Sequence, residues 1–287
     1  MKKNLLLLIF ISFCISRATA QWTAGNVGSW ELNDMQMVSP TQGFMVSITS
    51  VWTTTNAGAN WSTLHYIQSD SLYYQNISKH ALYFFNSSTG VVVGKDWNNK
   101  SIIIRTTNGG TLWTTVYLGT TGVRFKDVWF TDASNGIAVS TGGKIVRTTD
   151  GGLTWNAVSS GTIDDLYAVH FDPSNPNTGV ACGDEVMLRT TNGGASWTPA
   201  AFSGVYFTSV NFAGANVGYA CGDYTDALYK TVDGGANWQV VPTNVSHFNA
   251  VYFLSPDTGY ACDGSLYRTT DGGVSWEENI VPGAGDL

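Results

Sequence analysis

The chain has 287 residues, a formal net charge of −7 at pH 7, and only 12% charged residues against 13% aromatic ones. An acidic chain without basic clusters along its sequence is not expected to bind nucleic acid or an anionic membrane surface. Its length is ample for a hydrophobic core, and its 32 glycines are typical of short strands joined by tight turns.

Residues 1–20 carry the pattern of a secretory signal peptide. Lys2 and Lys3 precede a short apolar stretch, and Ala18-Thr19-Ala20 supplies the small residues of a cleavage site. The apolar stretch is too short for a membrane-spanning helix, and no second one follows it. We therefore predict export to a periplasmic, lumenal or extracellular location, no membrane span, and a single domain over residues 21–287.

The rest of the chain is organised by one repeated segment, seen most clearly in residues 147–155, Arg-Thr-Thr-Asp-Gly-Gly-Leu-Thr-Trp. The β-branched residues favour a strand, the Asp accepts backbone N–H groups in a turn, and the glycines adopt positive φ easily. The Trp then buries a large apolar surface as the next strand begins. Copies recur roughly every 40 residues, the length of one four-stranded propeller blade. Six copies are present, with Asp or Asn at Asn56, Asn108, Asp150, Asn192, Asp233 and Asp271.

Each repeat divides into four short strands, which we name a to d in chain order. In the fourth repeat they fall at residues 166–171, 179–183, 186–190 and 196–198, with turn residues between them. Short strands without helical periodicity predict an all-β fold. Because one repeat cannot bury both of its faces, we predict a β-propeller of four-stranded blades with six repeats. A seven-bladed closure stays open, as does an outer strand that Gln21 and Trp22 add to the last blade.

Three cysteines occupy one position of successive repeats, where the earlier repeats carry valine: Cys182, Cys221 and Cys262, after Val46, Val93 and Val139. A position that alternates between Val and Cys is typical of a buried apolar site. Equivalent positions in neighbouring blades lie beyond the reach of a disulfide. We therefore predict three free thiols and no metal site built from them.

The Thr-Thr-Asp/Asn-Gly-Gly-x-x-Trp repeats resemble Asp-box (BNR) repeats. In the form Arg-Thr-Thr-Asp-Gly-Gly they are most similar to the propeller family of photosystem II stability and assembly factors. The resemblance covers nearly all of the chain after residue 20 and implies a role in complex assembly. Its motifs are specific for fold rather than activity, because Asp-box propellers also include sialidases, xyloglucanase-type glycoside hydrolases and sortilin-type receptors. The first copy departs from the pattern with Ala57 in place of the first glycine.

We assign the repeated Asp and Asn residues to turn structure rather than to catalysis. Three of the six copies carry Asn, which caps a turn but cannot act as a general acid or base. The repeated arginines are likewise expected to bind neighbouring backbone or carboxylates: Arg105, Arg147, Arg189 and Arg268. Within residues 21–287 only Arg124 then remains, so the arginine triad that the resemblance implies for a sialidase cannot form.

The resemblance places the c–d turns on one face and the b–c and d–a loops on the opposite, ligand-binding face. The c–d turns repeat almost verbatim, whereas the opposite loops differ from repeat to repeat, which is typical of recognition on a rigid scaffold. The predicted binding residues on these loops are acidic apart from one tryptophan: Asp96, Trp97, Asp184, Glu185, Asp223, Asp226 and Asp263. We expect exposed acids, a protein partner with a basic surface, and Trp97 as its apolar anchor.

One insertion, residues 64–79, breaks the period and contains His65, Tyr66, Tyr73 and Tyr74. It either adds an aromatic patch to the binding face or packs against the less regular first blade. Both interpretations remain open at this point.

Taken together, these patterns predict an exported, non-enzymatic propeller that binds a protein or helps to assemble a complex. No catalytic residue and no cofactor are predicted, and the histidines show no metal-ligand spacing. The alternative is a glycan-binding or glycoside hydrolase propeller of the xyloglucanase or sialidase type. A two-carboxylate glycosidase needs its acids about 5–9.5 Å apart, whereas the loop acids of adjacent blades are expected to lie about 10 Å or more apart.

Overall fold

The computed structural model describes residues 32–279 except 49, 65–77, 224–226 and 246. The predicted signal peptide, Gln21, Trp22, Asp226 and most of the 64–79 insertion lie outside these residues. The described chain is all β apart from one 3-10 turn, η2 (Thr141–Gly143). None of its helical segments has the length and apolar character needed to cross a membrane.

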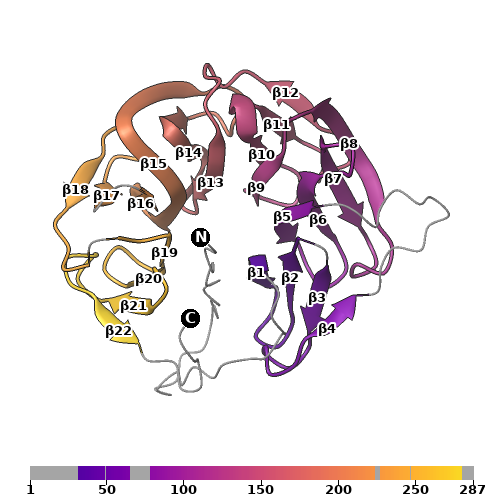
Figure 1. Ribbon diagram of the computed structural model, residues 1–287, viewed down its shortest axis with the longest axis horizontal. Coiled ribbons are helices and arrows are strands. Elements are labelled where there is room, and N and C mark those ends of the chain that lie inside the picture. Colours follow the sequence, from indigo (N-terminus) through magenta and orange to yellow (C-terminus); the bar gives the residue numbers. More distant parts are fainter. Residues whose placement is uncertain (1–31, 49, 65–77, 224–226, 246, 280–287) are drawn as a thin grey trace.

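The described strands form five antiparallel sheets around a central axis (Figure 1). The first sheet holds β1 (Leu32–Met37), β2 (Gly43–Ser47), β3 (Val51–Thr54) and β4 (Ser62–Leu64). The second holds β5 (Ser78–Phe84), β6 (Gly90–Lys95), β7 (Lys100–Thr106) and β8 (Thr114–Thr121). The third holds β9 (Phe125–Phe130), β10 (Gly136–Ser140), β11 (Ile145–Thr148) and β12 (Asn156–Val158), and the last holds β19 (Ala250–Phe253), β20 (Gly259–Cys262), β21 (Leu266–Thr269) and β22 (Glu277–Asn279).

The fourth sheet has six strands where the sequence predicts two separate four-stranded blades. It holds β13 (Leu166–Asp172), β14 (Asn175–Thr190), β15 (Thr198–Gly214), β16 (Val217–Asp223), β17 (Leu228–Thr231) and β18 (Gln239–Val241). β14 runs through strands b and c of the fourth repeat. The two strands join at Glu185, which has a φ of 53°, without a loop between them. The first part of β15 pairs with β14, and its last part pairs with β16. The fold is thus a β-propeller in which five described sheets carry six Asp-box turns.

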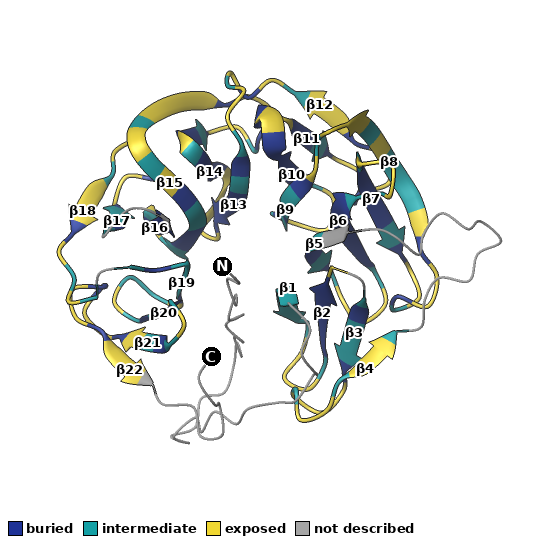
Figure 2. Ribbon diagram, viewed as in Figure 1, coloured by how far each residue is buried: buried dark blue, intermediate teal, exposed yellow. Residues whose placement is uncertain are grey.

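The hydrophobic core lies at the interfaces between neighbouring sheets (Figure 2). Trp155 is 7% exposed and packs with Val91 and Ile103 of the preceding sheet and with Phe130 of its own. The repeat tryptophans therefore join blades rather than filling single ones. The three cysteines are buried in this core and form no disulfide within the described residues, as their alternation with valine predicts.

Candidate functional site

Hydrogen bonds divide the turns of the propeller between two faces. Each c–d turn bonds to the a–b turn of its own repeat, as in the 2.9 Å bond from the Gly151 N–H to the Ser134 carbonyl. The b–c and d–a connections meet at the opposite end of the strands, where the Thr141 N–H donates to the Arg124 carbonyl at 3.0 Å. We call the first the Asp-box face and the second the loop face.

The Asp-box residues hold their turns through one network in every copy. In the third repeat, the Thr148 hydroxyl donates to Asp150 Oδ1 at 2.8 Å and accepts the Gly152 N–H at 3.0 Å. Asp150 Oδ1 also accepts the Thr154 N–H at 2.9 Å, and Asn56 accepts the equivalent N–H at the same distance. The hydroxyl and the N–H of Thr154 lower the pKa of Asp150 to about 2. Because an amide oxygen makes the same bonds as a carboxylate, the position acts as a turn cap.

Three of the four repeated arginines tie their repeat to the next. The Arg105, Arg147 and Arg189 Nε–H groups donate to the carbonyls of Gly151, Gly193 and Gly234 at 2.9, 2.9 and 2.8 Å. Each acceptor lies in the Asp-box turn of the following repeat. These guanidinium groups are therefore committed to the scaffold through backbone contacts, as expected from their regular spacing.

The innermost strands enclose a central cavity of about 1120 Å³. Side chains rather than backbone ladders bridge these strands across the sheet interfaces. Asp34 Oδ2 accepts the Leu82 N–H at 2.8 Å, and Asp127 Oδ2 accepts the Val169 N–H at 2.8 Å. Both carboxylates thus satisfy inward-facing amides of the next sheet that would otherwise lack a partner.

A second level of bridges lies closer to the Asp-box face. Gln36 Oε1 accepts the Phe84 N–H at 2.6 Å, and Asn211 Oδ1 accepts the Phe253 N–H at 2.7 Å. His170 Nδ1 accepts the Phe212 N–H at 3.1 Å. The polar lining of the cavity at these positions therefore serves first to join the blades.

The two bridging aspartates have strongly altered acidity. Burial raises the pKa of Asp34 to about 6, and burial together with the Asp34 charge raises the pKa of Asp127 to about 7. Burial also lowers the pKa of His80 to about 4, helped by the charges of Lys126 and Arg124. The raised pKa values of the two aspartates and the lowered pKa of His80 have opposite effects on how stability depends on pH. A substitution of one residue therefore separates their contributions best.

We expect Asp127→Asn to change how stability depends on pH. The folded protein binds more protons at Asp127 than the unfolded chain between pH about 4 and about 7, so this carboxyl costs stability as the pH rises through that range. The free energy of unfolding of the wild type should therefore fall relative to that of the variant by an amount on the order of 4 kcal/mol across this range. Urea unfolding of both proteins across this range measures the difference, and a constant difference would contradict the assignment.

The mouth of the cavity on the loop face takes one side chain from the loop-face end of strand a in each repeat: Asn33, His80, Lys126, Tyr167, Thr208 and Asn249. The Lys126 amine lies 5.3 Å from the centre of the Tyr167 ring. The Tyr167 hydroxyl donates to Asp184 Oδ2 at 3.2 Å. Burial lowers the pKa of Lys126 and raises that of Asp184. The mouth thus brings a cation, an aromatic ring and a carboxylate together.

Asp96 and Trp97 lie on the b–c turn of the second sheet. Asp96 closes this turn by accepting the Lys100 N–H at 2.7 Å and by donating its own N–H to the Lys100 carbonyl at 2.8 Å. Trp97 stands at the apex of the turn and is 56% exposed. The pair divides into one residue that builds the loop and one that is presented to solvent.

The other predicted acids differ in exposure. Glu185 is exposed, whereas Asp184 and Asp263, like Asp96, are half-buried rather than exposed as the sequence predicts. Both bond within the protein: Asp184 accepts from Tyr167, and Asp263 Oδ1 accepts from Asn249 Nδ2 at 3.2 Å. Asp223 ends β16, but its side chain and all of Asp226 lie outside the described residues. The aromatic residues 65–74 of the insertion also lie outside them.

Sequence reasoning missed the central cavity and the cations at its mouth. His80, Lys126, Tyr167 and Thr208 are separated by roughly one repeat each and look unrelated along the chain. When the repeats are aligned, one position of strand a is polar in each of them. This pattern could have indicated the cavity, because that position faces the axis in every repeat. Among the described residues, no group of three or more His, Cys, Asp or Glu side chains is placed to hold a metal ion.

Comparison with known proteins agrees with the repeat pattern and the fold. A family model described as photosynthesis system II assembly factor YCF48 matches residues 112–205. No curated protein matches the chain. The chain is an Asp-box (BNR) propeller by its repeats and its structure.

Solved structures show the same fold at low identity. YCF48 bound to a D1 peptide is 17% identical with a TM-score of 0.66, and the alignment covers 91% of this chain and 88% of that one. YCF48 from Cyanidioschyzon merolae is 20% identical with a TM-score of 0.70, and the alignment again covers 91% of this chain and 88% of that one. An ancestral GH74 enzyme is 19% identical with a TM-score of 0.67, covering 91% of this chain but 40% of that enzyme.

Proposed function

We propose that this protein is a non-enzymatic propeller that binds an extended protein segment on its loop face and so helps to assemble a complex. The observation that carries this proposal is the contrast between the two faces. The Asp-box face repeats one set of internal hydrogen bonds, whereas the loop face presents Trp97, 56% exposed, beside charged residues that differ between repeats. Exposed aromatic residues on otherwise polar surfaces are frequent anchors of protein interfaces.

The comparisons support a protein partner. One of the similar propellers is a YCF48 structure bound to a D1 peptide, and the matching family model describes an assembly factor. By analogy, the loop face here receives a peptide segment of a protein under assembly. The half-buried acids Asp184 and Asp263, with the exposed Glu185, favour a segment that carries basic residues. A photosynthetic complex is the partner only if the cell that makes this protein is photosynthetic.

Two finer expectations belong to the same proposal. The six Asp-box turns, and the change of pairing partner within β15, support counting the six-stranded sheet as two blades, which makes six in all. The pattern of residues 1–20 supports export, with residues 21–287 as one mature propeller domain. Mass spectrometry of the N-terminus of the native protein tests the cleavage after Ala20.

We expect the double variant Trp97→Ala/Glu185→Gln to lose binding of peptides selected on the wild-type protein from a random peptide display library. Both side chains are exposed, so stability should change by less than about 1 kcal/mol. Loss of an exposed aromatic anchor should weaken binding tenfold or more, measured by fluorescence anisotropy.

The matched control changes two exposed apolar residues of the Asp-box turns, Leu153→Ala/Val274→Ala, each 55% exposed in the wild type. Binding should survive in this control. If the control loses the peptides while the loop-face variant retains them, the proposed orientation of the molecule is wrong.

The alternative function is glycan binding or glycoside hydrolysis. Its specific support is the GH74 fold similarity, together with two carboxylates, Asp34 and Asp127, beside the central cavity. Each of these carboxylates already accepts two backbone N–H groups, from Met35 and Leu82 and from Val128 and Val169. Because these hydrogen bonds hold both carboxylates in the scaffold, we favour protein binding over hydrolysis. If the protein releases sugar from any member of a polysaccharide panel, hydrolysis becomes the better-supported function.

A further inference from the structure

The loop-face mouth of the central cavity is divided by charge. On the side of the second and third sheets, Lys126 extends over Tyr167, and Lys95 ends β6 with its amine 3.0 Å from Asn99 Oδ1. Arg124 lies next to β9, where its main chain exchanges two 3.0 Å hydrogen bonds with Thr141. Among the described residues, none of these three cations has a carboxylate oxygen within 4.0 Å.

These cations act together on one region of the mouth. His80 lines the cavity beside them, and the charges of Lys126, Arg124 and Lys95 all add to the effect of burial in lowering its pKa. His80 is therefore neutral at physiological pH and does not add to their charge. Lys126 lines the mouth itself, and Lys95 at the end of strand b and Arg124 on a d–a loop lie near enough to act on the pKa of His80.

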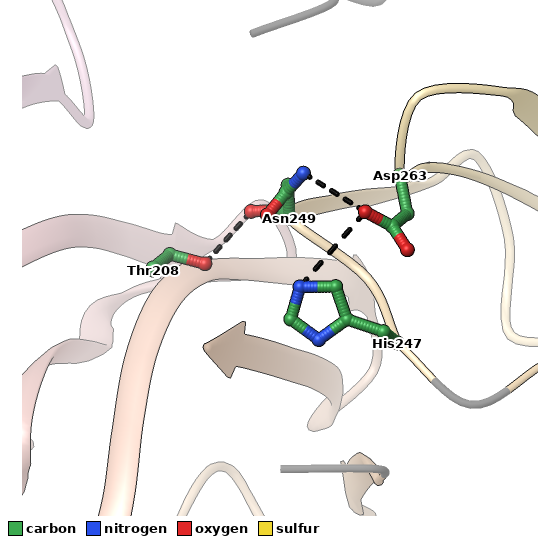
Figure 3. Close-up of polar contacts among 4 residues, drawn as sticks. All are labelled: Thr208, His247, Asn249 and Asp263. Atoms are coloured by element: carbon green, nitrogen blue, oxygen red, sulfur yellow. Dashed lines mark hydrogen bonds and ion pairs between the residues drawn. The ribbon is translucent and has the colours of Figure 1, made fainter. Parts of the chain in front are cut away.

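Acidic residues follow on the fourth repeat, and the charges of Asp165 and Asp184 reach Lys126, where they oppose the lowering of its pKa. Asp184 faces the cavity beside Tyr167, and Asp165 and Glu185 lie next to it on the d–a and b–c connections. Further around the ring, the Thr208 hydroxyl donates to the Asn249 carbonyl at 2.7 Å, and the Asn249 amide donates to Asp263 (Figure 3). Asp263 keeps 36% of its side chain exposed, with His247 Nε2 at 3.9 Å.

We propose that this mouth receives an extended partner segment that carries charges of both signs, with an acidic residue over Lys126, Lys95 and Arg124 and a basic residue against Asp184 and Asp263. This inference rests on the proposed function and deepens it by naming the chemistry of the partner. Complementary potentials set which partner binds and in which direction it lies. A segment with only basic residues would place like charges over Lys126, which costs affinity.

The geometry also limits how deep the acidic residue reaches. Below the mouth, the bridging carboxylates Asp34 and Asp127 face the cavity, so an acid that passed Lys126 would meet two further acids. The acidic residue of the partner therefore stays at the rim. A basic side chain is not limited in this way and can reach inward past Asp184.

The test uses the intact protein and a random peptide display library, with sequencing of the enriched peptides. Selection on the wild type should enrich peptides that contain both an acidic and a basic residue. Selection on Lys126→Met should lose the preference for the acidic residue, and selection on Asp184→Asn should lose the preference for the basic one. Methionine is unbranched and similar in length to lysine, and it removes only the charge that stands over Tyr167, so Lys126→Met should fold normally.

Affinities of an enriched peptide complete the test. Lys126→Met should weaken it tenfold or more, while Lys126→Arg restores most of the affinity because it restores the charge. The control, Lys144→Met, removes a cation that bonds to Thr120 and lines a separate cavity, and it should change affinity less than twofold.

The outcomes separate this inference from the proposed function. If the enriched peptides carry only basic residues and still require Trp97, the proposed segment with charges of both signs is wrong. Binding of a peptide on the loop face would remain supported. Peptides that bind without Trp97 and without the mouth residues would overturn both. A failure to enrich any peptide would also count against both.

Discussion

Trp155→Ala is expected to cost about 3–5 kcal/mol of unfolding free energy, which is the range for a buried tryptophan that leaves a cavity. Trp155 is 7% exposed and stands edge-on to Phe130 at a centroid distance of 5.7 Å. Its cluster also contains Val91 and Ile103 of the preceding sheet, so the cavity opens at an interface between two blades. Chemical denaturation followed by tryptophan fluorescence and circular dichroism measures the loss.

The control for this experiment lies in the same turn. Leu153 is 55% exposed, and Leu153→Ala should change stability by less than about 0.5 kcal/mol. If both variants unfold at the wild-type denaturant concentration, the repeat tryptophans do not hold the blades together as described.

Gly183→Ala is the second substitution with a large expected effect. A Cβ atom at this position would lie 1.8 Å from the Asp165 carbonyl oxygen and 2.8 Å from the Leu166 Cα atom. Both neighbours are backbone atoms that cannot rotate away, so the b–c hairpin and the d–a loop must separate. We expect a cost of about 3 kcal/mol, at the upper end of the range for overpacking.

The same substitution should also weaken peptide binding, because the Asp184 N–H bonds to the displaced Asp165 carbonyl at 2.9 Å. The comparison is Gly204→Ala, where nothing lies within 4 Å and the only penalty is a φ of +75°. That variant should lose about 1 kcal/mol and keep its binding. Equal losses in the two variants would show that the close approach at Gly183 is unimportant.

These experiments address parts of the molecule that the sequence predicted with different success. The turn network of Thr148, Asp150 and Gly152 was predictable because every bond in it joins residues two to four positions apart. The arginine contacts were predictable in kind, since a regularly repeated strand residue faces the same neighbour in each repeat. Their acceptors in the following repeat required the structure.

The candidate site was only partly predictable. Trp97 and Glu185 are exposed on the loop face, as the variation of the b–c loops indicates. Asp184 and Asp263 are half-buried instead, because Tyr167 and Asn249 reach them from neighbouring strands. Lys126 was not predicted, since a single lysine in a strand carries no signal of the cavity that it faces.

The sequence by itself determined the repeat, the all-β class, the Asp-box turns and the buried Val/Cys column. Each of these depends on residues close together in the chain or on a periodic pattern of burial, and such information is local. Only the tertiary structure decided the six-stranded sheet, the bridging of inner strands by Asp34 and Asp127, and the charge division of the mouth. Those features join residues about one repeat apart, 48 positions for Asp34 and Leu82 and 42 for Asp127 and Val169. Their contacts arise from how neighbouring sheets are inclined around the axis, which no single repeat encodes.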